Sequence, residues 1–216
     1  MFRYIKKNEL FQFGGRHFIS EDHIRLHTMS YGAQIKGSNW ISNPYELLII
    51  VLKGKGLLST VEKNYEFNQG DQFYLTNVNY KIDAYTELEI ELIELPGLYG
   101  AALFSLEKSK IVFFKSKEIS LSPEQVLVNE VYGKVYVHKL KNEVYQSSLK
   151  SREELLILCL EGSCHFKINE GQFSVKKGEQ VYLKNEMFEI TVGDGTVLEF
   201  VQAPSETYMN MLILQK

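Results

Sequence analysis

The sequence has few cysteines and no long hydrophobic run, and each shortage excludes a class of protein. Its two cysteines, Cys159 and Cys164, lie five positions apart, which fits neither a disulfide framework nor a CxxC metal motif. No stretch of about 18 apolar residues occurs, and the N-terminal segment lacks an apolar run of the length found in secretory signals. We therefore expect a cytoplasmic protein that does not interact with a membrane.

An excess of charge of either sign is also missing. The chain has 24 lysines and arginines against 27 aspartates and glutamates, a net charge of −3 and a pI near 6.0. No basic stripe is present that would neutralise a phosphate backbone, so nucleic acid is not an expected partner. A hydrophobic content of 44% with 24% charged residues is ordinary for a folded globular protein.

What the sequence does contain is an internal repeat. Residues 46–77 match residues 154–185 without a gap, and 12 of the 32 aligned positions are identical. Glycine, glutamine, tyrosine and asparagine residues are among the identities. Upstream, residues 4–10 resemble residues 113–119. The duplication therefore extends over nearly the whole chain.

The length of the repeat indicates complete domains, because the units of solenoid proteins are much shorter. We predict two domains, residues 1–97 and 98–216, with a boundary near Pro96-Gly97. Within each domain, short apolar or alternating segments end at glycine-containing turns, which is typical of antiparallel sandwiches and barrels. The predicted fold is all-β, with two tandem antiparallel β-barrel domains.

The segments around these glycines resemble the two conserved segments of the cupin superfamily. Copy one has Leu-Lys-Gly-Lys-Gly at 52–56 and Gly-Asp-Gln-Phe-Tyr-Leu at 70–75, and copy two has Leu-Glu-Gly at 160–162 and Gly-Glu-Gln-Val-Tyr-Leu at 178–183. The nearest similarity is to the C-terminal cupin half of type I mannose-6-phosphate isomerases. The resemblance implies a bicupin of RmlC-like jelly rolls, or double-stranded β-helices. It also implies a sugar or sugar phosphate ligand and isomerase- or epimerase-like activity.

The residues with which such cupins hold a metal are missing. Metal-binding cupins carry two histidines and a glutamate just before the central strand and a third histidine after the second glycine segment, since imidazole and carboxylate suit first-row divalent metals. Residues 38–46 and 146–154 contain no histidine, although they end at Glu46 and Glu154. We therefore expect neither a metal nor a cofactor.

The third histidine position falls on Tyr80 or Lys81 in copy one and on Phe188 or Glu189 in copy two. Counting from the preceding glycine selects Lys81, whereas alternation with a buried Ile82 selects Tyr80. Because a one-residue slip exchanges the two faces of a strand, the sequence leaves both alternatives open. The aromatic pair would fill the barrels, whereas the charged pair would line pockets.

Four other residues complete the candidate ligand-binding set: Trp40, Glu46, His138 and Arg152. Trp40, the only tryptophan, lies in the loop where the missing metal ligands would be, and it would either stack on a sugar or plug the barrel. His138 is a candidate because imidazole titrates near neutrality. Arg152 would bind a carboxylate or phosphate, or pair with neighbouring acids. Glu46 would supply a single carboxylate.

Together these features predict a metal-independent bicupin that binds a small, carbohydrate-like molecule. The sequence shows no nucleophile motif and no phosphate-binding glycine loop, so no particular reaction is indicated. Two alternatives stay open. One is a ligand-sensing module without chemistry, and the other is a structural protein that forms a homodimer through a strand edge.

Overall fold

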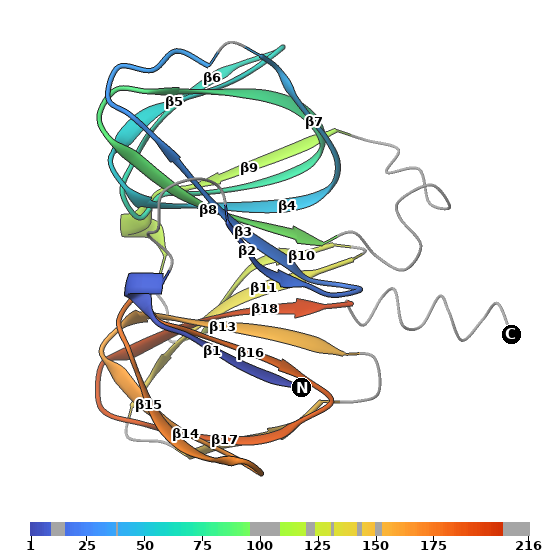
Figure 1. Ribbon diagram of the computed structural model, residues 1–216, viewed down its shortest axis with the longest axis vertical. Coiled ribbons are helices and arrows are strands. Elements are labelled where there is room, and N and C mark those ends of the chain that lie inside the picture. The colour runs from blue at the N-terminus through green and yellow to red at the C-terminus, as the bar shows by residue number, and fades with distance from the viewer. Residues whose placement is uncertain are drawn as a thin grey trace, which may run out of the picture. The chain divides into compact units, whose positions relative to one another are not determined.

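In the computed structural model, most of the described residues lie in antiparallel strands (Figure 1). It describes residues 1–9, 16–37, 39–95, 109–119, 124–130, 132–141, 144–149 and 153–204. The helical elements within these ranges are two short 3-10 turns, η1 (Lys7–Glu9) and η3 (Ser116–Glu118). None of the described helices is long and apolar enough to cross a membrane. The all-β prediction is confirmed.

The chain divides into two compact units, and unit 2 comprises Phe11–Glu118. Its strands form one sheet in the order β2-β3-β8-β4-β7-β5-β6, and β9 pairs with β7. The strands are β2 (Arg16–Ser20), β3 (Arg25–Tyr31), β4 (Ile41–Lys53), β5 (Lys55–Thr60), β6 (Asn64–Asn68), β7 (Gln72–Ala84), β8 (Leu88–Leu95) and β9 (Lys110–Phe114).

Unit 1 comprises Met1–Leu10 and Ile119–Lys216. It contains a six-stranded sheet in the order β1-β16-β13-β18-β11-β10 and a four-stranded sheet in the order β12-β17-β14-β15. The strands are β1 (Phe2–Ile5), β10 (Glu124–Asn129), β11 (Lys134–Leu140), β12 (Val144–Ser148), β13 (Glu154–Glu161), β14 (Ser163–Ile168), β15 (Gly171–Lys176), β16 (Gln180–Lys184), β17 (Met187–Val192) and β18 (Thr196–Ala203).

The first strand of each half of the chain belongs to the unit formed by the other half. β1 pairs with β16 and places Tyr4 opposite Val181, while β9 pairs with β7 and places Phe113 opposite Phe73. The sequence repeat aligns the same residues, so both pairings have the same register. The units therefore differ from contiguous halves divided after residue 97, and that boundary lies outside the described residues.

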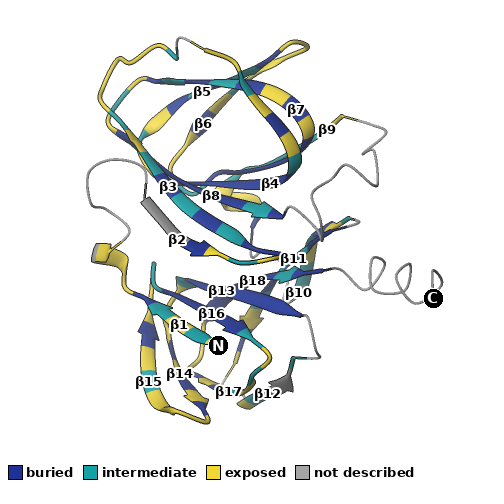
Figure 2. Cartoon of the chain, turned by 45° about the vertical axis from the view of Figure 1, so that its right-hand side comes forward, coloured by how far each residue is buried: buried dark blue, intermediate teal, exposed yellow. Residues whose placement is uncertain are grey.

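Each unit has an apolar core on one face of its strands. Leu47 and Ile49 of β4 contribute to the core of unit 2, and Leu155 and Ile157 of β13 contribute to that of unit 1. Alternate residues of a strand point to opposite faces, yet Leu48, between two core residues, is also buried. Figure 2 accordingly shows β4 and β13 buried through most of their length. Apolar residues on both faces explain why these strands are continuous hydrophobic runs.

The turn after each central strand requires glycine. Gly54 has a φ of 89° and Gly162 a φ of 75°, a left-handed conformation that other residues rarely adopt. A Cβ on Gly54 would also collide with the backbone oxygen of Glu87. The two aligned glycines thus fix the same turn in both units.

Candidate functional site

A left-handed asparagine decides which side of β7 faces the core. Before Asn77, the core-facing residues are Phe73 and Leu75, and after it the core-facing phase shifts by one position. Asn77 itself has a φ of 50°. As a result Tyr80 lies in the core with 3% of its surface exposed, and Lys81 lies on the opposite face.

The same change of phase occurs in unit 1. Asn185 has a φ of 56°, and Phe188 beyond it is a core residue that is 4% exposed. Glu189 consequently points to the opposite face of β17. The structure therefore adopts the register in which aromatic side chains, rather than Lys81 and Glu189, face the two cores.

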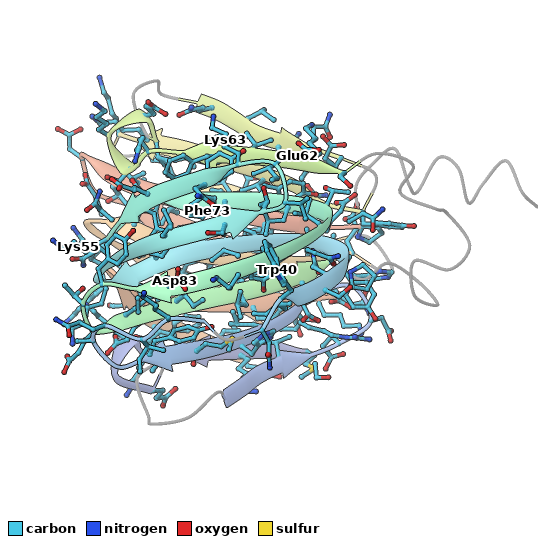
Figure 3. The ribbon with its side chains drawn as sticks, turned by 90° about the horizontal axis from the view of Figure 1, so that it is seen from above. Trp40, Lys55, Glu62, Lys63, Phe73 and Asp83 are labelled. Carbon is cyan, nitrogen blue, oxygen red and sulfur yellow. The ribbon has the colours of Figure 1, made fainter. Side chains whose placement is uncertain are left out.

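Lys81 and Trp40 lie on the outer surface of unit 2. The ammonium of Lys81 is 3.7 Å from a carboxylate oxygen of Asp83, which also accepts a hydrogen bond from the backbone N–H of Gly37 at 2.8 Å. Trp40 is 52% exposed, so it does not plug the core. Figure 3 labels Trp40 and Asp83 over the strands of unit 2. A ligand that contacted Trp40 or Lys81 would bind outside the core.

The remaining candidate acids occupy two different environments. Glu46 is fully buried on the face of β4 opposite the core, where it accepts a hydrogen bond from the hydroxyl of Tyr74. Glu189 lies opposite Lys167 in the register of β14 and β17. Arg152 lies outside the described residues. The ligand-binding roles of these residues stay predictions.

His138 lies among aromatic rings on the core-facing side of β11. Its ring centroid is 5.2 Å from that of Tyr136 and 5.5 Å from that of Phe200, in edge-on contacts. Tyr136 and Phe200 stack on each other at 4.9 Å. Tyr145 also packs against Phe200, so His138 contacts an aromatic cluster in the core of unit 1.

Two charged residues outside the predicted ligand-binding set face one end of the core of unit 2. Arg25 is in phase with Met29 of β3, which packs against the core, and Glu94 is in phase with the core residue Leu92 of β8. The antiparallel register places Arg25 directly opposite Glu94. Both side chains are half-buried. No ion pair joins them within the described part of the chain.

Aromatic groups complete this site. The guanidinium carbon of Arg25 lies 5.9 Å from the ring centroid of Tyr45, which is within the range of a cation–π interaction. Burial raises the pKa of Tyr80, and the nearby Tyr31 and Glu94 raise it further. We call Arg25, Tyr45, Tyr80 and Glu94 the Arg25 cluster.

In the segments where metal-binding cupins carry their ligands, the side chains at core-facing positions do not fit a metal centre. In unit 2 these positions hold Ile41, Leu47 and Tyr80, and in unit 1 they include Leu155 and Phe188. None of these side chains is an imidazole or a carboxylate, the ligands that first-row divalent metals prefer. Within the described ranges, no group of three or more His, Cys, Asp and Glu residues is arranged to hold a metal ion.

Comparison with solved structures identifies the fold. The chain is similar to a cupin 2 conserved barrel domain protein from Leptotrichia buccalis, with 18% identity over 94% of this chain and 96% of that one and a TM-score of 0.68. It is also similar to the bacterial pirin YhhW from Escherichia coli, solved in complex with nickel(II), with 12% identity over 95% and 100% of the two chains and a TM-score of 0.68. The chain has the cupin fold.

The solved structures with this fold include an enzyme. Salicylate 1,2-dioxygenase from Pseudoaminobacter salicylatoxidans has 9% identity over 89% of this chain and 73% of its own, with a TM-score of 0.67. No protein-family model matches the sequence, and no curated protein matches it by sequence. Because cupins with this fold have different functions, the site itself must carry any functional argument.

Proposed function

We propose that the chain is a bicupin that binds a small polar organic molecule without a metal. The observation that carries this proposal is the Arg25 cluster, which places a cation, an anion and two phenols at one end of the core of unit 2. Charged groups that face a core are costly unless they bind something. Ligand sites in proteins typically combine apolar walls with a few such convergent polar groups.

The repeated conformations support an origin by duplication. Gly54 and Gly162 both adopt left-handed backbone angles, and so do Asn77 and Asn185. Each pair is aligned in the sequence repeat. Because a left-handed asparagine at one position in a strand is uncommon, its occurrence at the same place in both halves favours descent from one cupin domain.

A sugar or sugar phosphate is the ligand class that the resemblance to mannose-6-phosphate isomerases implies. The Arg25 cluster has the donors and acceptors to bind hydroxyl groups and an anionic group. We propose binding rather than isomerisation, because an efficient general acid or base has a pKa near the working pH. The pKa of Tyr80 is instead raised from its ordinary value of 10.0.

Two measurements test this proposed function. Metal analysis of the full chain, purified without a histidine tag, should show no stoichiometric zinc, iron, manganese or nickel, and about one metal per chain would contradict metal independence. Thermal unfolding with sugars, sugar phosphates and organic acids should reveal a stabilising ligand, since a ligand at 100 times its dissociation constant adds about 2.7 kcal/mol.

The variant Arg25→Gln assigns any such stabilisation to the site. It should abolish the shift, whereas Lys55→Gln should leave the shift unchanged because Lys55 is exposed on β5. A ligand that stabilises both variants equally would bind elsewhere and contradict the assignment. No response to any compound, together with a dimer in light scattering, would favour the structural alternative.

A further inference from the structure

The two charges of the Arg25 cluster are arranged to be satisfied together by one ligand. Arg25 and Glu94 are directly opposite each other on neighbouring antiparallel strands, where Cβ atoms are about 4.5–5.5 Å apart. Tyr45 lies against the guanidinium. Among the described residues, neither Arg25 nor Glu94 makes an ion pair, so a donor and an acceptor are available side by side.

We propose that the Arg25 cluster binds a small hydroxy acid, a molecule that carries a carboxylate and a neighbouring hydroxyl group. This inference rests on the proposed binding function and names its ligand class. Arg25 would bind the carboxylate, because a guanidinium presents paired donors that match both oxygens. Glu94 would accept the hydrogen bond of the hydroxyl, since an ionised carboxylate is only an acceptor.

Tyr80 supplies a second donor to the carboxylate. Burial, Tyr31 and Glu94 all raise the pKa of its phenol, so the hydroxyl keeps its proton at neutral pH and can donate it in a hydrogen bond. Tyr45 would help to hold the guanidinium in place through a cation–π contact, since its ring centroid is 5.9 Å from the guanidinium carbon. Arg25, Tyr45 and Tyr80 would thus orient the planar carboxylate group of the ligand at the end of the core.

The charges of the cluster also disfavour the competing ligand classes. A neutral sugar would give the half-buried guanidinium of Arg25 no anion to bind, and an unpaired charge is costly away from water. A phosphate carries up to two negative charges, so the carboxylate of Glu94 beside Arg25 would repel it more strongly than it repels a single carboxylate. A simple carboxylate would satisfy Arg25 but leave Glu94 without a donor. A hydroxy acid satisfies both side chains.

A matched set of six-carbon compounds tests the ligand class. We would measure binding of gluconate, glucose, glucose 6-phosphate and hexanoate to the full chain by isothermal titration calorimetry and saturation-transfer NMR. Gluconate should bind at least tenfold more tightly than each of the other three, because it alone combines a carboxylate with a neighbouring hydroxyl. Weaker or absent binding of gluconate would overturn the proposed ligand class.

Variants separate failure of the ligand class from failure of the site. Arg25→Gln should weaken gluconate binding at least tenfold, and Arg25→Lys should restore part of it by returning the charge. Glu94→Gln should reduce the preference for gluconate over hexanoate, while Lys55→Gln should change neither. Tight binding of glucose 6-phosphate that depends on Arg25 would overturn the hydroxy acid but keep the site. Binding that is unchanged in Arg25→Gln and Glu94→Gln would overturn both the ligand class and the site.

Discussion

The orientation of Tyr80 predicts that two adjacent substitutions will have very different effects on stability. Tyr80 is 3% exposed and belongs to the core of unit 2. An aromatic side chain buries about 150–250 Å², which at roughly 25 cal/mol per Å² corresponds to about 4–6 kcal/mol. Measured replacements of buried aromatics by alanine cost about 3–5 kcal/mol. We expect Tyr80→Ala to lie in that range.

Lys81→Ala is the matched control, because it removes a side chain from the opposite face of the same strand. The Lys81 side chain is 29% exposed, and its ion pair with Asp83 spans 3.7 Å. Surface ion pairs of this kind contribute about 0–1 kcal/mol. The expected difference between the two variants is therefore at least about 2 kcal/mol.

Urea unfolding of the full chain, followed by circular dichroism and by the fluorescence of Trp40 in unit 2, measures this difference. The pair Phe188→Ala and Glu189→Ala repeats the comparison in unit 1, where Phe188 is 4% exposed. The reasoning would be refuted if Lys81→Ala destabilised as much as Tyr80→Ala, because the charged side chain would then face the core.

Three further outcomes follow from local structure. Gly54→Ala should lower the free energy of unfolding in urea by about 1–3 kcal/mol, because of left-handed strain and a backbone clash. Gly193→Ala should cost less, because a Cβ added there meets open space; equal costs would contradict this reasoning. Cys159 and Cys164, each 1% exposed, should resist a thiol reagent until the chain unfolds; rapid labelling of the native chain would contradict their burial. Because the pKa of Tyr80 is raised in the folded chain, its phenol loses a proton more readily in the unfolded chain. The free energy of unfolding should therefore fall as pH rises above 10.0, and it should fall less in Tyr80→Phe. Identical alkaline unfolding of the two proteins would count against this.

The sequence predicted the fold from its repeat but could not predict the face of β7. Counting from the glycine assumed an unbroken alternation up to Lys81, whereas Asn77 adds one left-handed residue and changes the phase. An asparagine adopts this conformation more readily than most residues, yet the presence of an asparagine does not by itself show that its backbone is left-handed here. The identity of Asn77 and Asn185 in the repeat was the available signal.

Arg25 and Glu94 were missed because β3 has buried residues on one face and half-buried residues on the other. Leu26 and Met29 point to opposite faces, and each packs in the interior, so the strand lacks the alternation of apolar and polar residues that would assign Arg25 to a face. Glu94 has the same problem, since Ile93 beside it is fully buried. Only the observed register brings the two charges together.

The sequence contained part of the information needed to predict the exchange of first strands. The match between residues 4–10 and 113–119 indicated that both segments hold equivalent places. It did not show which sheet each segment joins, because strand pairing within one half and exchange between halves satisfy the same pattern. Backbone pairing of Tyr4 with Val181 decides for exchange.

Comparison of the two units indicates which of them would bind the proposed ligand. The register places Lys134 opposite Gln202 in unit 1, as it places Arg25 opposite Glu94 in unit 2. Unit 1 thus keeps a cation but has no acid across from it, and Phe188 supplies no hydroxyl where unit 2 has a phenol. The proposed hydroxy acid would need all three groups, and at these positions unit 2 carries them while unit 1 does not. Unit 1 is therefore expected to stabilise the protein without binding the ligand.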